Sequence, residues 1–414
     1  MKDKGQQQSV FSLAVLVAAL GYFVDIYDLL LFSIIRIPSL RSLGLTDDRI
    51  AKDGLFIINI QMLGLLIGGI LWGVLGDKKG RLKVLFASII LYSLGNIANG
   101  FVQTVNQYAL VRFISGIGLA GELGAGITLV AELLPKEKRG IATSLVAGIG
   151  LTGAVVAFFI KELFPWRTCY FIGGGLGFLL LLLRVSVLES GMFKRIERTN
   201  VSKGNFFMLF ANKTRIRKYI TAIFIGLPTW YVIGILITFS KEFGNKLGIQ
   251  GTIDPGKSIM FAYVAISVGD ILAGFVSKWL KSRKKALYIF YSITAIGIAW
   301  FFNLHNASVT SLYIVSALLG FGTGFWAIFV TMAAEQFGTN IRATVATTVP
   351  NMVRGSLNLV SILFVWLQGS TGNYLTAGWI TGIVVLVIGF ISVMLSDETY
   401  HKDLNYIEGE PALS

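Results

Sequence analysis

The sequence has few charged residues and almost none of the residues that build metal or disulfide sites. Only 14% of its 414 residues are charged, against about 25% in a typical soluble protein. It has one cysteine, Cys169, and two histidines, His305 and His401, which fall in a predicted loop and tail. A lone cysteine excludes a disulfide framework and a thiolate metal cluster. The motif G-x-x-x-x-G-K-[ST] is also missing, so no P-loop for nucleotides is expected.

What the sequence has is length and apolarity. Hydrophobic residues make up 54% of the chain, and the mean hydropathy is +0.72. Runs of about 20 apolar residues, long enough to cross roughly 30 Å of hydrocarbon as a helix, recur twelve times. We therefore predict an all-α membrane protein with twelve transmembrane helices. The first run is too long for a cleavable signal and lacks a small-residue cleavage site, so it is expected to remain as the first helix.

The net charge of +14 would suit a nucleic-acid partner, so the placement of the basic residues matters. With the N-terminus inside, Lys and Arg concentrate in the inner segments, which is the positive-inside pattern. No basic run is interleaved with base-stacking aromatic residues, so no nucleic-acid partner is expected. The sequence predicts a multi-pass protein of the inner (cytoplasmic) membrane, in contact with the lipid bilayer, with both termini cytoplasmic. We expect a monomer.

Two acids interrupt the first apolar run, residues 12–35. Asp25 and Asp28 are three residues apart and so share a helix face. A charge at such depth is costly and usually functional. Because no predicted helix contains a histidine, carboxylates are the expected proton carriers. Asp25 has no basic residue at its depth in the first half and is predicted to bind and release a proton. Alternatively, it faces an open, water-filled cavity and only contributes to the electrostatic potential there. Residues 36–53 are predicted to form a charged outer loop.

The fourth run, residues 107–133, holds Arg112 and Glu122. At about 1.5 Å per residue, Asp28 and Arg112 lie at similar depths below the outer ends of their helices, so the two are predicted to pair. Protonation of the acid would then release the arginine, whereas the alternative is a static packing salt bridge. Glu122 is a candidate coupling residue or, alternatively, a hydrogen-bond acceptor that serves helix packing.

In the eleventh run, residues 343–368, Arg354 is the deeply placed cation. Its guanidinium stays charged and presents a planar fork that suits carboxylate or phosphate. Asn351 and Asn358 flank it at helical spacing, so we predict an anionic-substrate site here; the alternative is an ion pair with Asp270 of the eighth run. Three aromatic residues are candidate walls of the same site, with lipid contact or packing as the alternative: Trp230, Tyr231 and Trp326.

The loop after the second run reads GVLGDKKGRLK at residues 73–83. Asp77 follows a small-residue helix end and can pair with Arg81 or face a helix N-terminus. This string resembles the loop signature of the major facilitator superfamily and falls between the second and third helices, where that family keeps it. The resemblance implies two six-helix halves and a gating role for Asp77 and Arg81.

Further stretches extend the resemblance over nearly the whole chain. RFISGIGLAGE at residues 112–122 resembles the fourth-helix pattern of sugar porters, which pair its Arg with a first-helix Asp, and of metabolite:proton symporters. AELLPKEKRG at residues 131–140 and ESGMF at residues 189–193 resemble signatures that follow. The first-helix string G-x-x-x-D-x-Y-D resembles metabolite:proton symporters, which have Glu in place of Asp25, and phosphate:proton symporters, which have Asp at both positions.

An internal repeat supports two halves without family knowledge. Ala-Glu and a following Arg recur in both halves, and four of these residues are candidate gating residues: Glu132, Arg139, Glu335 and Arg342. Such a repeat indicates parallel halves with substrate bound between them near the midplane. The predicted division is residues 1–188 and 219–396 for the two halves, 189–218 for a cytoplasmic linker and 397–414 for a cytoplasmic tail.

The residues and the resemblance together predict a transporter and no enzyme. We expect symport: import of a small, anionic organic solute with a proton by alternating access, with no cofactor beyond the proton as coupling ion. A proton-coupled exporter or a sugar or phosphate transporter of the same fold would share these motifs. A membrane solute sensor is the alternative outside transport, although no signalling domain or catalytic cluster is visible in the sequence.

Overall fold

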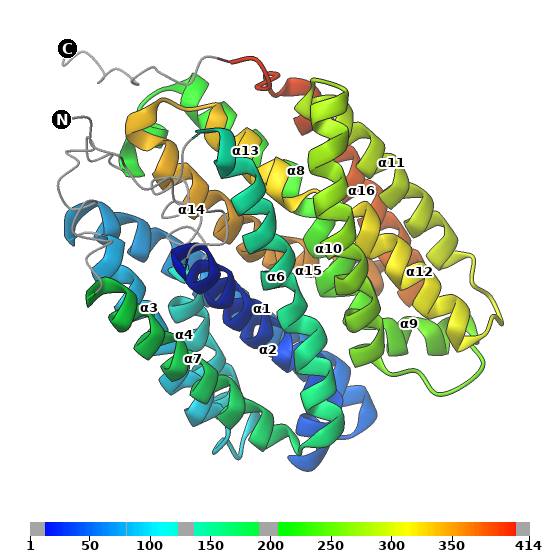
Figure 1. The fold of residues 1–414 in the computed structure, drawn as a ribbon. Helices are drawn as coiled ribbons and strands as arrows, with labels where there is room; N and C mark the ends of the chain where they lie inside the picture. Colours follow the sequence, from blue (N-terminus) through cyan, green and yellow to red (C-terminus); the bar gives the residue numbers. More distant parts are fainter. Residues whose placement is uncertain (1–12, 80, 123–135, 190–205, 403–414) are drawn as a thin grey trace, which may run out of the picture.

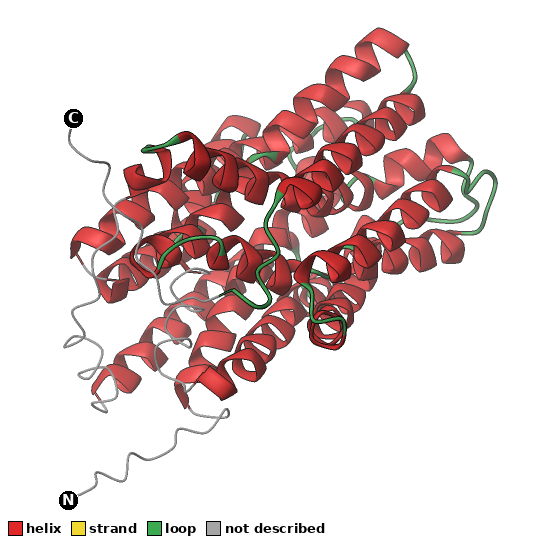
Figure 2. Ribbon diagram, turned by 90° about the horizontal axis from the view of Figure 1, so that it is seen from above, coloured by secondary structure: helices red, strands yellow, loops and turns green. Residues whose placement is uncertain are grey.

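The computed structural model describes residues 13–79, 81–122, 136–189 and 206–402, and these ranges are helical apart from turns and an isolated bridge between Gln250 and Ser308 (Figures 1 and 2). Ten helices among them are long and apolar enough to cross a membrane. With the shorter helices α3 and α4 they complete the twelve predicted spans, which confirms the all-α membrane fold in two halves.

The first half contains the helices α1 (Leu13–Ser42), α2 (Asp47–Lys79), α3 (Arg81–Asn99), α4 (Val105–Leu119), α6 (Lys136–Leu163) and α7 (Trp166–Glu189). The short 3-10 helix η2 (Phe206–Phe210) precedes the second half. The second half contains α8 (Lys213–Tyr231), the π-helix η3 (Val232–Ile237), α9 (Ser240–Leu247), α10 (Pro255–Trp279), α11 (Arg283–Phe302), α12 (Val309–Gly322), α13 (Trp326–Glu335), α14 (Thr339–Gly355), α15 (Leu357–Thr371) and α16 (Tyr374–Leu395). The predicted boundaries of the linker, after residue 188 and after residue 218, stay predictions.

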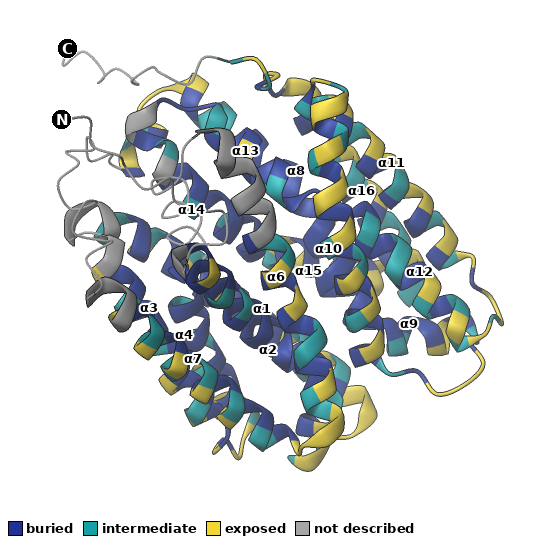
Figure 3. Cartoon of the chain, viewed as in Figure 1, coloured by how far each residue is buried: buried dark blue, intermediate teal, exposed yellow. Residues whose placement is uncertain are grey.

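Glycines set the closest helix contacts inside the first half. Gly64 and Gly68 of α2 face the backbone of α4 at Phe113 and Ile117, where a Cβ atom would clash. Gly153 of α6 meets the backbone of α1 in the same way. Lipid is as apolar as a leucine side chain, so membrane helices associate through such close packing rather than through burial from water. Helix α1 is consequently buried along most of its length among these neighbours (Figure 3).

Three spans of the second half are broken. The seventh passes from α8 into the π-helix η3 just after Pro228, the tenth breaks between α12 and α13, and the eleventh breaks at Ser356. Broken backbone at membrane depth needs partners inside the protein. At the tenth span the carboxylate of Asp270 supplies one, since it accepts a hydrogen bond of 2.8 Å from the backbone N–H of Ala327.

The first span is longer than predicted. The prediction that residues 36–53 form a charged outer loop is wrong. Helix α1 continues to Ser42 and α2 begins at Asp47. The prediction ended the helix at the first charge, Arg36, as if that charge needed water. In the structure Arg36 is fully buried and forms an ion pair of 2.7 Å with Glu242 of α9, so the helix continues past it.

Candidate functional site

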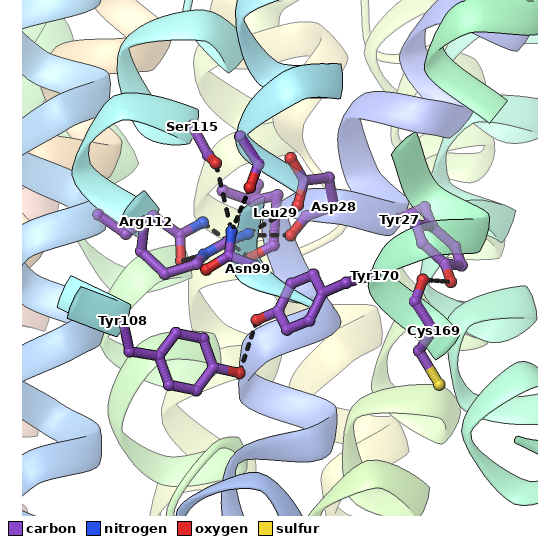
Figure 4. A network of polar contacts seen from close by, with 11 residues as sticks. Tyr27, Asp28, Leu29, Asn99, Tyr108, Arg112, Ser115, Cys169 and Tyr170 are labelled. Atoms are coloured by element: carbon purple, nitrogen blue, oxygen red, sulfur yellow. Dashed lines mark hydrogen bonds and ion pairs between the residues drawn. The ribbon is translucent and has the colours of Figure 1, made fainter. Parts of the chain in front are cut away.

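The first buried charge pair joins α1 to α4. Arg112 and Asp28 are both fully buried, with Nη1 2.7 Å from Oδ1 (Figure 4). A second guanidinium nitrogen donates to the backbone oxygen of Asp28, 2.9 Å away, and Nε donates to Gln61 over 3.2 Å. The contact expected from helix depth is therefore present, and its role in proton coupling stays a prediction. The sequence missed Gln61, an uncharged residue that orients the arginine.

The second pair crosses between the halves. Nη2 of Arg354 on α14 lies 3.3 Å from Oδ2 of Asp25 on α1. The expected alternative, an ion pair of Arg354 with Asp270, is wrong, because Asp270 caps the start of α13. The expectation that Asp25 is unpaired is also wrong, because it compared depths only within the first half. Arg354 and Asp25 face each other where the two halves meet.

This second pair is incompletely satisfied. Among the described residues, Nε and Nη1 of Arg354 and Oδ1 of Asp25 have no hydrogen-bond partner, although both side chains are 99% or more buried. Arginine donors in a dry site normally meet acceptors, and each unmet charged donor costs free energy. The geometry leaves two N–H donors of a cation, on different edges of the guanidinium, open to an anion.

Two buried indole rings belong to spans of the second half that pack near Arg354. Gly226 and Gly234 of the seventh span contact Val353 and Leu357 of the eleventh span, and Trp230 lies between the two glycines in the sequence. The ring of Trp326 packs at a tilt against Phe329, 5.2 Å between centroids, and Phe329 also reaches Gly226. Within the described ranges neither indole N–H has a partner.

Two tyrosines missed by the sequence complete the surroundings. Tyr22 of α1 and Tyr263 of α10 are buried within electrostatic range of both Arg354 and Asp25. Tyr22 is one turn from Asp25, at i, i+3, which is the spacing that would have indicated it. The surroundings of Arg354 are thus aromatic from both halves.

Other predicted substrate residues make protein contacts. The hydroxyl of Tyr231 donates to the backbone oxygen of Gly378, 2.6 Å away, so it contacts α16. The Asn351 amide donates to Ala120 of the first half over 2.8 Å, and the Asn358 amide donates to Gly355 in its own span over 3.0 Å. Asn351 therefore ties the halves together, and Asn358 satisfies the break in the eleventh span.

Glu122 forms a third buried pair. Both of its carboxylate oxygens accept from the two terminal nitrogens of Arg184 on α7. The sequence analysis assigned Arg184 no partner, and the structure places it 7% exposed inside the bundle. The pair lies against Gly21 of α1, where any Cβ would clash with it. Glu122 is therefore an ion-pair partner. Its roles in proton coupling and in helix packing remain predictions.

The gating candidates are described only in part. Glu335 pairs with Arg283 over 3.1 Å, and Arg342 donates to the backbone oxygen of Phe337, 3.0 Å away. Glu132 lies outside the described residues. The side chains of three further candidates are likewise outside what the structure describes: Asp77, Arg81 and Arg139.

The start of the predicted tail packs on the second half. Glu398 accepts hydrogen bonds from the hydroxyl of Ser282 and from the backbone N–H groups of Arg283 and Lys284, which begin α11. Partial burial opposes ionisation of Glu398, but these hydrogen bonds outweigh it and hold the pKa of its carboxyl below the usual value. Thr399 donates to Glu335 over 2.7 Å and so joins the tail to the candidate gating residue.

At the end of the bundle that is outer by the predicted orientation, two ion pairs cross between the halves. Arg36 of α1 binds Glu242 of α9, and Lys161 of α6 binds Asp254, which caps α10, over 2.8 Å. Between them Ile34 of α1 contacts the start of α10 at Gly256. The two pairs join the halves at this end of the structure.

Breaking the first of these pairs is expected to open the outer end. Glu242→Gln leaves Arg36 buried without its counter-charge, a change that costs about 3–5 kcal/mol for a fully buried pair and less here because Glu242 is 20% exposed. We expect about tenfold faster thiol labelling of Ile34→Cys in a Cys169→Ala background, since tenfold corresponds to about 1.4 kcal/mol.

Asp254→Asn is the matched control for this measurement. It breaks the second crossing pair, whose two partners are 19% and 26% exposed, so its effect on labelling is expected to be smaller. Unchanged labelling in Glu242→Gln would show that Arg36 does not hold the outer end closed.

A two-lobed bundle of apolar helices, with charge pairs buried on facing spans, defines a polytopic membrane transporter. The family model described as Major Facilitator Superfamily matches residues 11–360, so the chain belongs to this family. The expected resemblance is confirmed, and the protein is a transporter and not an enzyme.

Relatives span nearly all of the chain. The niacin transporter NiaP of Acinetobacter baylyi is 27% identical over 432 residues, covering 94% of this chain and 95% of the relative. The benzoate transport protein of the same organism is 25% identical over 367 residues, covering 80% of this chain and 78% of the relative. The proton:xylose symporter XylE has the same fold, with a TM-score of 0.71, 18% identity and coverage of 95% and 97%.

Proposed function

We propose that the protein is a proton-coupled symporter that imports a small aromatic monocarboxylate. The observation that carries this proposal is Arg354, which is buried beside Asp25 with two guanidinium nitrogens free of partners in the described chain. A carboxylate can accept a charge-assisted hydrogen bond from either free nitrogen, and it makes a bidentate contact at that edge once Asp25 releases Nη2. A sugar would leave the positive charge uncompensated, so the geometry favours an anion.

The aromatic part of the proposal rests on the buried rings in this region. Tyr22 and Tyr263, one from each half, lie within electrostatic range of Arg354, and Trp230 and Trp326 are buried in the second half. A flat ring on the substrate would pack against such rings at favourable edge or offset geometry. The free indole N–H groups add donors for a ring nitrogen or a second oxygen. Relatives named for niacin and benzoate transport support the same class of solute.

Asp25 provides the link to the proton. When it is ionised it neutralises Arg354, and when it is protonated the guanidinium is free to bind the substrate carboxylate. The empty deprotonated site and the site with one proton and one anion are therefore both neutral. The other two occupancies carry a net charge, which is costly to enclose between two apolar halves. The two halves therefore close readily only around a neutral site. This restriction couples the transport of one proton to that of one anion.

The proposal includes the setting of the protein. It would lie in the inner membrane with both termini cytoplasmic, act as a monomer and need no cofactor besides the coupling proton. The excess of basic residues in the inner segments supports this orientation. An exporter would share the geometry, so direction is decided by comparing right-side-out with inside-out vesicles.

A ligand panel tests the substrate class directly. A ligand at about 100 times its Kd stabilises a protein by about 2.7 kcal/mol, so binders raise the melting temperature. We expect nicotinate and benzoate to stabilise the purified protein and their amides, nicotinamide and benzamide, to have little effect, because only the acids neutralise Arg354. D-xylose and inorganic phosphate serve as comparators. Stabilisation by xylose or phosphate alone would contradict the proposal.

Transport is then measured in proteoliposomes with an inward proton gradient. We expect initial uptake of nicotinate to exceed that of protein-free liposomes and to fall when a protonophore collapses the gradient. Uptake that ignores the gradient would remove the symport mechanism while leaving the substrate class intact. Binding without any transport would favour the sensor alternative.

A further inference from the structure

Helix α3 carries a stripe of polar residues in the interior of the first half. Tyr92, Asn96 and Asn99 follow at i, i+4 and i+7 and so share one face, and Ser93 adjoins them. All four are fully buried. Neither the substrate site nor the outer ion pairs use these residues.

The stripe is short of hydrogen-bond partners. Four of its side-chain atoms have none within the described ranges: Tyr92 Oη, Ser93 Oγ, Asn96 Oδ1 and Asn99 Oδ1. The amide nitrogen of Asn96 has only the carboxylate of Asp28 within reach. Buried polar atoms are nearly always satisfied, and each bare one costs about 1–3 kcal/mol. Four along one helix therefore indicate bound water, which typically makes two to four hydrogen bonds to such groups.

The facing helix cannot supply the missing partners. Gly173 and Gly177 of α7 lie opposite the stripe: a Cβ at Gly173 would come 3.3 Å from Nδ2 of Asn96, and one at Gly177 would clash with Ser93 Oγ. Glycine has no side chain to offer, and its backbone groups are bonded within their own helix. Water is the remaining partner on this side.

The stripe runs between two of the buried charge pairs. Toward its outer end the amide of Asn96 lies within reach of the Asp28 carboxylate, and Asn99 donates to Ser115 over 3.4 Å, one turn from Arg112. Figure 4 draws Asn99 and its hydrogen bond to Ser115 in the same polar network as Asp28 and Arg112.

At the other end of the stripe the hydroxyl of Tyr92 lies within electrostatic range of Glu122 and Arg184. Seven residues of helix separate Tyr92 from Asn99, about 10 Å. That distance is short enough for a few waters in file.

We infer that the α3 stripe binds a short file of water that relays protons between Asp28 and Glu122. A proton given up by one acid passes to the first water, each water passes one on, and the last protonates the other acid, so the file is left unchanged. Asp25 is within electrostatic range of both acids. The relay rests on the proposed symport; the water site does not.

The first test addresses the water and needs no substrate. X-ray radiolysis in ¹⁸O-water labels side chains next to bound water, even where bulk solvent does not reach. We expect Tyr92 to be labelled severalfold faster than Tyr231 and Tyr291, which are equally buried but donate to the backbone oxygens of Gly378 and Ile225. Equal labelling of the three tyrosines would show that the stripe is dry and would overturn the inference.

The second test addresses the relay. Asn96→Leu keeps a similar volume and removes the polar atoms, whereas Asn96→Ser keeps a hydroxyl and leaves room for water. In pyranine-loaded proteoliposomes we expect Asn96→Leu to lower nicotinate-driven proton entry at least about tenfold, with nicotinate exchange within about twofold of wild type, since exchange moves no net proton. Asn96→Ser is expected to retain most proton entry.

Equal loss of proton entry and exchange in Asn96→Leu would mean a packing defect and would overturn the relay, as would wild-type proton entry. If the unmodified protein moves no protons with nicotinate or benzoate, the symport proposal fails and the relay fails with it. The labelling of Tyr92 still decides whether the water site exists.

Discussion

Arg354→Gln is expected to lower the affinity for nicotinate and benzoate by at least about 100-fold. The substitution removes two charge-assisted hydrogen bonds, each contributing about 1.5–3 kcal/mol, and about 1.4 kcal/mol corresponds to a factor of ten in affinity. Nicotinamide should bind the variant and the wild type equally weakly, because the uncharged amide forms no ion pair with Arg354. Isothermal titration of the purified proteins measures both.

This substitution also leaves Asp25 buried without its cation, which could unfold the protein and imitate a loss of binding. The double variant Asp25→Asn, Arg354→Gln removes both charges and is expected to recover thermal stability without recovering nicotinate binding. Arg354→Lys separates charge from shape, since lysine keeps the charge and loses the planar fork. Full affinity in either variant would show that the carboxylate binds elsewhere.

The twelve spans and the two halves could be predicted because the length of each apolar run and the internal repeat can be identified directly in the sequence. The Asp28–Arg112 contact could be predicted because both helices belong to one half and their depths can be compared. Asp25 and Arg354 were each identified as important, yet their contact was missed. The position of a residue along a helix gives its depth in the membrane but not the direction in which its side chain points. How one half packs on the other cannot be obtained from either half alone.

Two other buried arginines were missed. Arg36 was placed in a loop because a charge was taken to mark the end of a span, and Arg184, inside the sixth predicted span, was assigned no partner. Each is instead buried against an acid from a distant part of the chain, Glu242 and Glu122. The polar residues of α3 drew no notice because they are uncharged. Their spacing of four and three residues was the signal that could have identified that face.

The buried ion pairs divide into those within a half and those between halves. Asp28–Arg112 and Glu122–Arg184 join helices of the first half, so rocking of the two halves need not break them. Asp25–Arg354 and Arg36–Glu242 cross between the halves and must change whenever the halves separate. In the proposed alternating-access cycle these crossing pairs are therefore the ones that change, and Asp25 is the acid that lies at Arg354, the proposed substrate arginine.

Asp25→Asn is expected to abolish accumulation of nicotinate while preserving its exchange. The variant resembles the protonated acid permanently, so the anion-loaded site stays neutral and still closes. The empty site, however, retains the charge of Arg354 and closes at a high cost, which prevents the empty return that net uptake requires. Uptake driven by a proton gradient and counterflow exchange, measured on the same proteoliposomes, separate the two steps.

The pH dependence of binding gives a second readout of the same idea. In the wild type an anion displaces Asp25 from Arg354 and favours its protonation, so nicotinate should bind more tightly as pH falls, by up to about tenfold per unit. The range of about pH 6 to 8 is suitable because a simple carboxylate stays ionised there. Asp25→Asn should give a flat profile, and Asp28→Asn, the matched variant at the pair within one half, should retain the slope. A wild-type slope in Asp25→Asn, or proton-driven accumulation at the wild-type level, would assign the coupling proton to another acid.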